Sequence, residues 1–187
     1  SLGNKLKIET LSIEGAYHIH PTKIGDERGH FFRWFCKREI SEALDFEVVQ
    51  ANQSFNSSQY TMRGLHFQKG NASEAKIVRC NKGKIFDVLL DLRKNSPSFL
   101  KWEAVELTED LQNMLLIPRG CAHGFLTLDT NCEVIYLHDN YYNPDLEDGV
   151  HFADPQVKIK WPFEPREISE RDKNFSNLPE NYQGLNV

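Results

Sequence analysis

The sequence predicts a mainly β protein, an antiparallel sandwich or barrel with a few short helices. Short runs rich in β-branched and aromatic residues recur along the chain, and turn signals separate them. Helical periodicity is scarce. This combination is typical of antiparallel sheets that stack as a sandwich or close into a barrel. The expected strands include 47–51, 76–80, 84–93, 100–107, 113–117, 121–128 and 132–138.

The N-terminal part is expected to contain further strands. Residues 17–20 form a strand that stops at Pro21, because proline lacks the amide proton that a sheet ladder needs. Residues 25–29 have glycine at both ends and charged residues between them, which indicates a turn. The segment 30–35 that follows is rich in strand-forming aromatic residues, so it is interpreted as a strand.

One short helix is expected near the N-terminal strands. In the segment 37–44, the apolar residues Ile40, Ala43 and Leu44 recur at helical spacing with charged residues between them. This pattern predicts a helix with one buried face.

Beyond Tyr141 the chain changes character. Prolines interrupt a polar segment, and a second short helix is expected over 169–175. No repeat or linker divides the sequence. We therefore expect a single domain over 1–187, with a C-terminal extension from about 143.

Composition excludes several classes of partner. The chain has 187 residues and a net charge of −5 without a basic block, which argues against binding to nucleic acid. Its apolar runs are too short to cross a bilayer, so no membrane partner is expected. The cysteines are scattered without a CxxC pair, which favours reduced thiols and a cytoplasmic location over a disulfide framework. They are Cys36, Cys80, Cys121 and Cys132.

Two histidines have contexts that suggest chemistry. His66 alternates with Gly64 and Gln68, so these three share one face of a strand. His123 lies between Gly120 and Gly124 at the start of an apolar strand. A histidine titrates near neutral pH and serves as a base or a metal ligand. The alternative for either residue is a hydrogen-bonded structural role; His18, His20, His30, His138 and His151 are expected on surfaces or strand faces.

No metal site is expected. A barrel metal site of this kind needs two histidines two residues apart and a carboxylate several residues further on. Here Gln68 replaces the second histidine, and Lys76 stands roughly where the carboxylate would lie. A lysine cation does not bind a divalent metal at neutral pH. It does stabilise an enolate oxygen, so Lys76 and His66 together suit proton abstraction beside a ketone, with a solvated surface lysine as the alternative.

An acid on the opposite side of the substrate is also needed for inversion at carbon. Tyr136 alternates with Val134 along the expected strand 132–138, and a phenol suits this role. Tyrosines on strands are common packing residues, so packing is the alternative.

A set of ordered motifs resembles the dTDP-4-dehydrorhamnose 3,5-epimerase family along nearly the whole chain. Each motif is weak alone, but their order is specific. They are 25–29, 63–68, 75–79, 86–88, 91–93, 96–97, 117–118, 120, 122–125, 141–142, 154–155 and 161–162.

The resemblance implies a cupin-type antiparallel jelly-roll barrel that forms a homodimer by exchanging N-terminal strands. It also implies that His66 is the base, that Asp172 aligns it, and that Tyr136 is the acid. Lys76 matches the residue that stabilises the enolate. Asp87 and His123 match a supporting pair in the pocket. Positions that contact the nucleotide diphosphate or the sugar correspond to Arg28, Gln50, Asn52, Arg63 and Tyr142.

Two positions depart from the family's pattern. Arg33 stands where glutamate is frequent, and Leu137-His138 follows Tyr136 where a lysine is common. Both changes would alter contacts with the nucleotide or the sugar and leave the proton-transfer residues unchanged.

The implied activity is inversion of C3 and C5 in a nucleoside-diphosphate-linked 4-keto-6-deoxyhexose, which converts dTDP-4-dehydro-6-deoxyglucose to dTDP-4-dehydrorhamnose without a cofactor or metal. The alternatives are a monofunctional 3- or 5-epimerase, a 3,4-ketoisomerase, a metal-dependent cupin enzyme, and a non-catalytic binder of sugar nucleotides.

Overall fold

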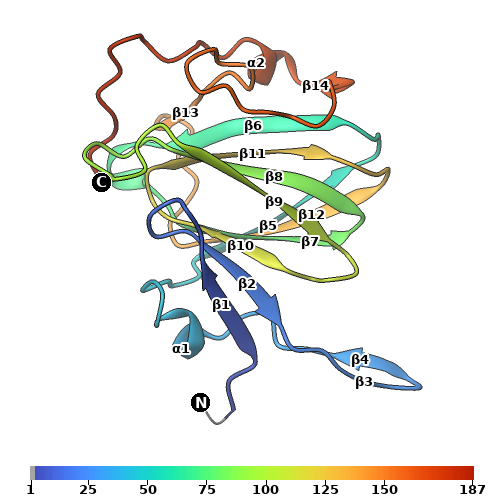
Figure 1. The fold of residues 1–187 in the computed structure, drawn as a ribbon. Helices are drawn as coiled ribbons and strands as arrows, with labels where there is room; N and C mark the ends of the chain where they lie inside the picture. Colours follow the sequence, from blue (N-terminus) through green and yellow to red (C-terminus); the bar gives the residue numbers. More distant parts are fainter. Residues whose placement is uncertain (1–2) are drawn as a thin grey trace.

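The computed structural model describes residues 3–187 and consists of two facing β-sheets (Figure 1). The first sheet has the order β1-β2-β10-β7-β12-β5, and the second has the order β13-β6-β11-β8-β9. All pairings in these orders are antiparallel. This is the jelly-roll arrangement, and the prediction of a mainly β, cupin-type antiparallel barrel is confirmed.

The strands of the first sheet are β1 (Leu6–Thr10), β2 (Tyr17–Pro21), β10 (Met114–Ile117), β7 (Lys76–Lys82), β12 (Cys132–His138) and β5 (Gln50–Asn56). Those of the second are β13 (Glu147–Gly149), β6 (Thr61–Gln68), β11 (Cys121–Thr127), β8 (Lys84–Asp91) and β9 (Trp102–Thr108). A short strand β14 (Glu167–Ile168) adds to β6 in parallel.

The remaining elements are small. The strands β3 (Ile24–Asp26) and β4 (Gly29–Phe31) form a hairpin that projects away from both sheets (Figure 1). The helices are α1 (Lys37–Ile40) and α2 (Glu170–Lys173), with a 3₁₀ turn at Gly70–Ala72. No helix among residues 3–187 has the length and apolar character that a membrane span requires.

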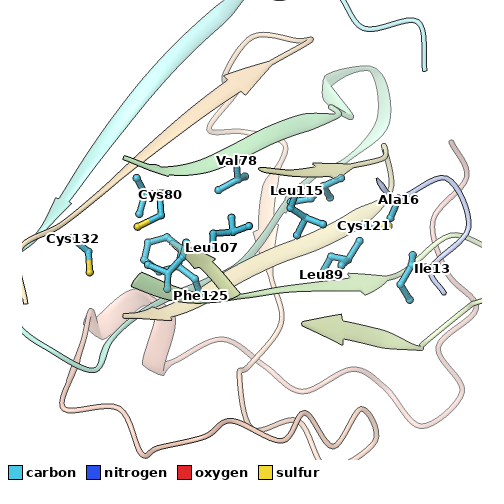
Figure 2. Packing of buried hydrophobic residues seen from close by; sticks show 13 residues of the cluster. Ile13, Ala16, Val78, Cys80, Leu89, Leu107, Leu115, Cys121, Phe125 and Cys132 are labelled. Carbon is cyan, nitrogen blue, oxygen red and sulfur yellow. The ribbon is translucent and has the colours of Figure 1, made fainter. Parts of the chain in front are cut away.

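The core lies between the sheets because alternate side chains of each strand point to the same face. Val78 and Leu115 of the first sheet and Leu89 and Phe125 of the second belong to one buried cluster (Figure 2). Burial of a side chain such as Phe125 stabilises the fold by about 1.5–3 kcal/mol. This apolar packing fills one part of the barrel and leaves polar side chains to line the rest.

Two further apolar clusters lie outside this core. Ile40 of α1 and Phe46 pack with Ile19 and Leu116 on the first sheet. Residues of the C-terminal segment, among them Val157, pack with residues of the second sheet, and this segment brings α2 over β6 (Figure 1).

Several element boundaries differ from the sequence expectations. The strand expected over 47–51 begins instead at Gln50 and runs to Asn56. The strand expected over 30–35 ends at Phe31, and Trp34 beyond it stacks on the guanidinium of Arg79, 4.3 Å from ring centroid to Cζ. The helix expected over 37–44 is regular only to Ile40, although the Leu44 amide still donates to the Ile40 carbonyl. The helix expected over 169–175 is α2.

A buried carboxylate fixes the N-terminal strand. Glu39 is 2% exposed and accepts hydrogen bonds from the amides of Lys5 at 2.6 Å and Leu6 at 2.9 Å. Arg33 also donates to it at 2.7 Å. Burial opposes ionisation of Glu39, but the three donors outweigh that effect and lower its pKa to about 2. Arg33, which departs from the family's usual residue, is therefore an ion-pair partner of Glu39.

We expect Glu39→Gln to lower the free energy of unfolding at pH 7 by about 2–3 kcal/mol, because the donors lose their charged acceptor. A depressed carboxyl pKa contributes stability above the unfolded value of 4.5 and loses it as the pH falls through about 2. The difference between the two proteins should therefore shrink from pH 5 to pH 2 in urea unfolding. A difference that stays constant with pH would contradict the assignment.

Candidate active site

One pocket opens between the two sheets and receives residues from both. Most of the sequence-predicted site residues line it: Gln50 and Asn52 on β5, Arg63 and His66 on β6, Lys76 on β7, His123 on β11, Tyr136 on β12, and Tyr142 in the loop after β12. Asp87 and Asp172 contact lining residues from behind. Arg28 is the predicted site residue that the structure places elsewhere.

Arg28 lies in the turn between β3 and β4 and does not line the pocket; this hairpin projects away from both sheets (Figure 1). Its side chain is 86% exposed and pairs with Asp26 at 2.6 Å. The pocket is therefore built without Arg28.

His66 and Asp172 form a dyad that joins β6 to α2. His66 Nε2 lies 2.6 Å from Asp172 Oδ1, and the Gly64 amide donates to Asp172 Oδ2 at 3.0 Å. Asp172 is held in turn because Ser169 caps α2 by accepting from its amide. Burial opposes ionisation of Asp172, but the hydrogen bond from His66 and its positive charge lower the pKa of this carboxyl. An ionised Asp172 fixes the proton on Nε2 and leaves Nδ1 of His66 to act as a base.

Two glycines, Gly64 and Gly124, allow strands β6 and β11 to approach closely next to this dyad. Gly64 has φ +109°, and a Cβ there would lie 2.6 Å from the Cα of Gly124. A Cβ on Gly124 would lie 2.8 Å from the carbonyl oxygen of Arg63. Strands β6 and β11 therefore approach closely at this point, and their register places His66 opposite His123.

His123 and Asp87 form a second pair, deeper than the first. His123 Nε2 lies 2.6 Å from Asp87 Oδ1, and the two residues are 4% and 0% exposed. Burial lowers the pKa of His123, although the Asp87 charge opposes this effect. The ring of His123 meets that of Tyr136 edge-on, with centroids 6.4 Å apart.

Lys76 carries its amine into the interior of the barrel, where it is 7% exposed. Burial lowers its pKa, and the charges of Glu74 and Asp87 oppose that effect. A solvated surface lysine, the alternative considered from the sequence, is therefore wrong. The group is placed to interact with an oxygen of a molecule in the pocket.

Tyr136 lies in the same pocket with its hydroxyl 2.8 Å from Ser54 Oγ. Burial raises the pKa of the phenol, and the hydrogen bond with Ser54 only partly offsets this. Tyr136 therefore keeps its proton at neutral pH, as an acid must.

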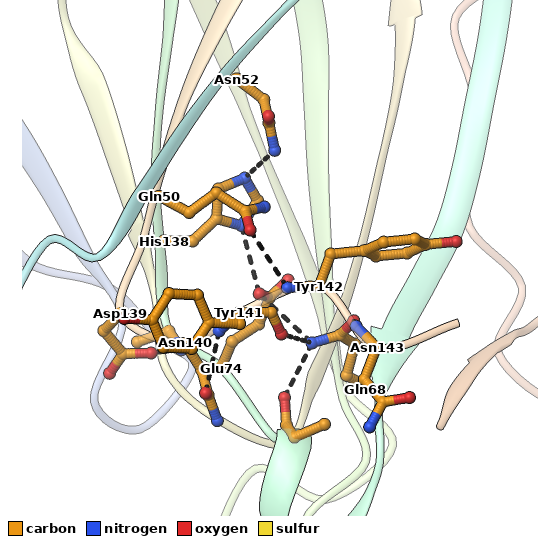
Figure 3. Close-up of polar contacts among 12 residues, drawn as sticks. Gln50, Asn52, Gln68, Glu74, His138, Asp139, Asn140, Tyr141, Tyr142 and Asn143 are labelled. Atoms are coloured by element: carbon orange, nitrogen blue, oxygen red, sulfur yellow. Dashed lines mark hydrogen bonds and ion pairs between the residues drawn. The ribbon is translucent and has the colours of Figure 1, made fainter. Parts of the chain in front are cut away.

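His138 was expected on a surface or strand face, but it lines the pocket and is 8% exposed. Its Nε2 lies 3.0 Å from Asn52 Nδ2 and its Nδ1 lies 3.2 Å from Glu74 Oε2 (Figure 3). Alternation with Tyr136 along β12 was the available signal, because residues two apart share a face. Gln68, Glu74 and Glu147 also line the pocket and were not predicted to.

Gln68 has a structural role at the pocket wall. Its side-chain amide donates to the carbonyls of Ala72 at 2.8 Å and Tyr141 at 3.0 Å, and its oxygen accepts from the Asn143 amide at 2.8 Å (Figure 3). Across residues 3–187, no group of three or more His, Cys, Asp or Glu side chains is placed to hold a metal ion. The metal-dependent alternative therefore has no ligand set in this part of the chain.

The family profile of dTDP-4-dehydrorhamnose 3,5-epimerase matches residues 10–180. The chain belongs to this family. Its relatives include the dTDP-4-dehydrorhamnose 3,5-epimerase of Escherichia coli strain K12, 42% identical over 94% of this chain and 96% of that protein. Another is the enzyme of the same name from Methanothermobacter thermautotrophicus, 40% identical over 91% of this chain and 93% of that protein.

Solved structures of this epimerase family share the fold. A dTDP-6-deoxy-D-glucose-3,5-epimerase from Legionella pneumophila, crystallised with dTDP-4-keto-L-rhamnose, superposes with a TM-score of 0.90 at 32% identity, covering 97% of this chain and 98% of that one. The crystal structure of a dTDP-4-dehydrorhamnose 3,5-epimerase from Elizabethkingia anophelis gives 0.89 at 35% identity, covering 96% and 100%.

We expect Lys76→Met to raise the free energy of unfolding at pH 7 by about 1 kcal/mol or more, because it removes the cost of burying an ammonium. A lysine with a lowered folded pKa loses this penalty as the pH rises from that pKa towards the ordinary value of 10.5. In urea unfolding, the advantage of the variant should therefore shrink at alkaline pH. A variant less stable than the wild type at pH 7 would show that the buried charge is a net stabiliser.

Proposed function

We propose that this chain inverts C3 and C5 of dTDP-4-dehydro-6-deoxyglucose and so forms dTDP-4-dehydrorhamnose. The observation that carries the proposal is the set of groups in one pocket: an aligned imidazole, a buried amine and a protonated phenol. These are the base, the enolate stabiliser and the acid that the reaction needs. Membership of the epimerase family supports the assignment of substrate class.

The first half-reaction is proton abstraction. A ketone acidifies the C–H bonds on both neighbouring carbons, and Nδ1 of His66 accepts the proton from one of them. The negative charge moves to the ketone oxygen, which Lys76 stabilises when its amine is protonated. Asp172 stabilises the imidazolium that forms, because it accepts the hydrogen bond from Nε2 at 2.6 Å.

The second half-reaction is protonation from the other face. The phenol of Tyr136 delivers a proton to the same carbon, which inverts it. Ser54 stabilises the phenolate by its hydrogen bond until solvent restores the proton. His66 releases its proton to solvent, and the same cycle at the second carbon then completes the 3,5-epimerisation.

A monofunctional epimerase is the second candidate, and relatives of that kind exist. A dTDP-4-dehydrorhamnose 3-epimerase from Streptomyces niveus is 34% identical over 94% of this chain and 85% of that protein. The proposal of two inversions is favoured because the 3,5-epimerases of Escherichia coli and Methanothermobacter thermautotrophicus are 42% and 40% identical. A pure binding role would not require the His66–Asp172 dyad.

The substrate diphosphate is proposed to lie at the mouth of the pocket, near Arg63, with Gln50, Asn52 and Tyr142 as further contacts. A contact from Arg28 is proposed to be made in the pocket of a second copy of the chain, since its hairpin projects away from both sheets of its own (Figure 1). Exposed apolar side chains on this hairpin, Ile24 at 57% and Phe31 at 76%, support the predicted homodimer. The homodimer, the single-domain organisation, the cytoplasmic location and the absence of a cofactor stay predictions.

We expect turnover of dTDP-4-dehydro-6-deoxyglucose in heavy water to introduce deuterium at both C3 and C5, because each inversion returns a solvent-derived proton. NMR of the product after reduction of its ketone gives the positions and the configuration. Deuterium at one carbon alone would establish the monofunctional alternative. Deuterium at neither carbon, with authentic substrate, would reject the epimerase assignment.

We expect Asp172→Asn to lower kcat by about 10²-fold or more, because the amide no longer stabilises the imidazolium. The dissociation constant of dTDP-glucose should change little. Glu170→Gln is the matched control, since Glu170 lies on the same helix with its side chain 82% exposed. Steady-state kinetics and calorimetry separate the two effects, and a fully active Asp172→Asn would refute the dyad.

A further inference from the structure

A chain of polar contacts crosses the pocket wall outside the proton-transfer residues. It runs from Asn52 through His138 to Glu74, with distances of 3.0 Å and 3.2 Å (Figure 3). Glu74 Oε2 also lies 3.5 Å from Gln68 Nε2. The side chains of His138 and Glu74 are 11% and 10% exposed, whereas Asn52 is exposed at the pocket mouth. The buried pair therefore holds one side of an exposed carboxamide.

The contacts define the protonation state that the structure represents. With the Asn52 amide oriented as it is, Nδ2 faces Nε2 of His138 and can only donate to it, which corresponds to the tautomer without a proton on Nε2. Nδ1 then carries the proton and donates it to the carboxylate of Glu74. In this neutral form, Asn52 turns its oxygen away from His138, and that oxygen has no hydrogen-bond donor among residues 3–187.

Protonation of His138 would reverse this arrangement. An imidazolium donates from both ring nitrogens, so Nε2 would need an acceptor in place of the Asn52 amide nitrogen. The two orientations of a carboxamide have nearly the same shape, and the hydrogen-bond partner decides between them. Asn52 would then turn its oxygen to His138 and its two N–H donors away from it.

The proposed substrate makes this reversal favourable. The diphosphate carries negative charge and accepts hydrogen bonds, so it prefers the N–H donors of Asn52 to its oxygen. It must also enter a pocket that already holds the carboxylate of Glu74. A proton on His138 compensates that carboxylate and supplies the imidazolium that turns the amide.

We propose that His138, held by Glu74, is a positioning residue for the nucleoside-diphosphate end of the substrate: it takes up a proton when the substrate binds and thereby directs the amide donors of Asn52 to the diphosphate. This inference rests on the proposed function. It gives a role to His138, which stands where the sequence departs from the family's pattern.

Other ionisable groups surround His138. Its own strand β12 contributes Tyr136, the neighbouring strand β7 contributes Lys76 opposite His138 in register, and β5 contributes the uncharged Gln50 and Asn52. The adjacent Asp139 is engaged with Arg119 at 3.1 Å. The remaining ionisable groups of the pocket are Arg63, His66, Glu74, His123, Tyr142 and Glu147. A variant of His138 leaves all of these groups in place. The difference in the pH dependence of binding between this variant and the wild type therefore reports on the proton on His138.

The test measures binding of dTDP-glucose by calorimetry from pH 6 to pH 8.5. Both phosphates of this probe are esterified, so its own charge stays constant over this range. The wild-type dissociation constant should rise with pH, approaching tenfold per unit where one proton is taken up. His138→Gln keeps a polar side chain that does not titrate. We expect it to bind about tenfold more weakly at pH 6 and to lose most of the pH dependence.

Two further variants sharpen the comparison. Glu74→Gln should keep the pH dependence but move it to lower pH, because the imidazolium loses its carboxylate partner. His151→Gln is the matched control, since His151 lies outside the pocket and its ring Nδ1 accepts from the Ala153 amide at 3.0 Å. This control should behave as the wild type. In turnover, His138→Gln should raise KM and keep kcat within about twofold, a split that a purely structural role would not produce.

The outcomes are separable. A wild type that does not bind dTDP-glucose would overturn the proposed function together with this inference. Tight binding with the same pH dependence in His138→Gln would overturn this inference alone, as would a fall in kcat at constant KM. Should that variant fail to fold, calorimetry of the wild type and Glu74→Gln at pH 7.5 in buffers of different ionisation enthalpy decides. Proton uptake that is present in the wild type and reduced in Glu74→Gln supports the proposal, and equal uptake rejects it.

Discussion

The buried amine of Lys76 is the constraint on which the pocket depends. Placing a cation inside a barrel is costly, because the interior solvates charge less well than water. The charges of Glu74 and Asp87 counteract this cost. Asp87 in turn fixes His123, whose ring supports Tyr136. One requirement of the proposed chemistry, a positive group near a ketone oxygen, thus accounts for much of the polar lining.

Apolar burial in the rest of the barrel offsets the cost of this buried charge. Val78 and Phe125 lie two residues beyond Lys76 and His123 on the same strands, so each pair shares the inner face of its strand. Val78 and Phe125 belong to the apolar core, whereas Lys76 and His123 line the pocket, which Phe125 borders. The close approach of β6 and β11 at Gly64 and Gly124 holds the two histidine strands together. The apolar core and the polar pocket therefore both lie between the same pair of sheets.

The sequence predicted the barrel and most of the pocket, and its failures have physical causes. Apolar strands such as β11 and β12 were recognised because their composition is typical of buried strands. The predicted bounds of the polar strand β5 were wrong because its residues face the pocket mouth and solvent, so no apolar pattern marks the strand. His138 was misassigned although it shares a strand face with Tyr136, because the family resemblance that brought Tyr136 into the pocket assigns no role to position 138. Arg28 lies in a family motif, but the sequence around it does not show whether it contacts the pocket of its own chain or that of a second copy.

The dyad joins parts of the chain that are made at very different times. His66 lies on β6, whereas Asp172 lies on α2, which follows every strand of both sheets. During synthesis, the strands of both sheets therefore emerge from the ribosome before α2, the helix that carries Asp172. A C-terminally clipped polypeptide that lacks α2 would thus keep the imidazole of His66 and lose the carboxylate that accepts its hydrogen bond.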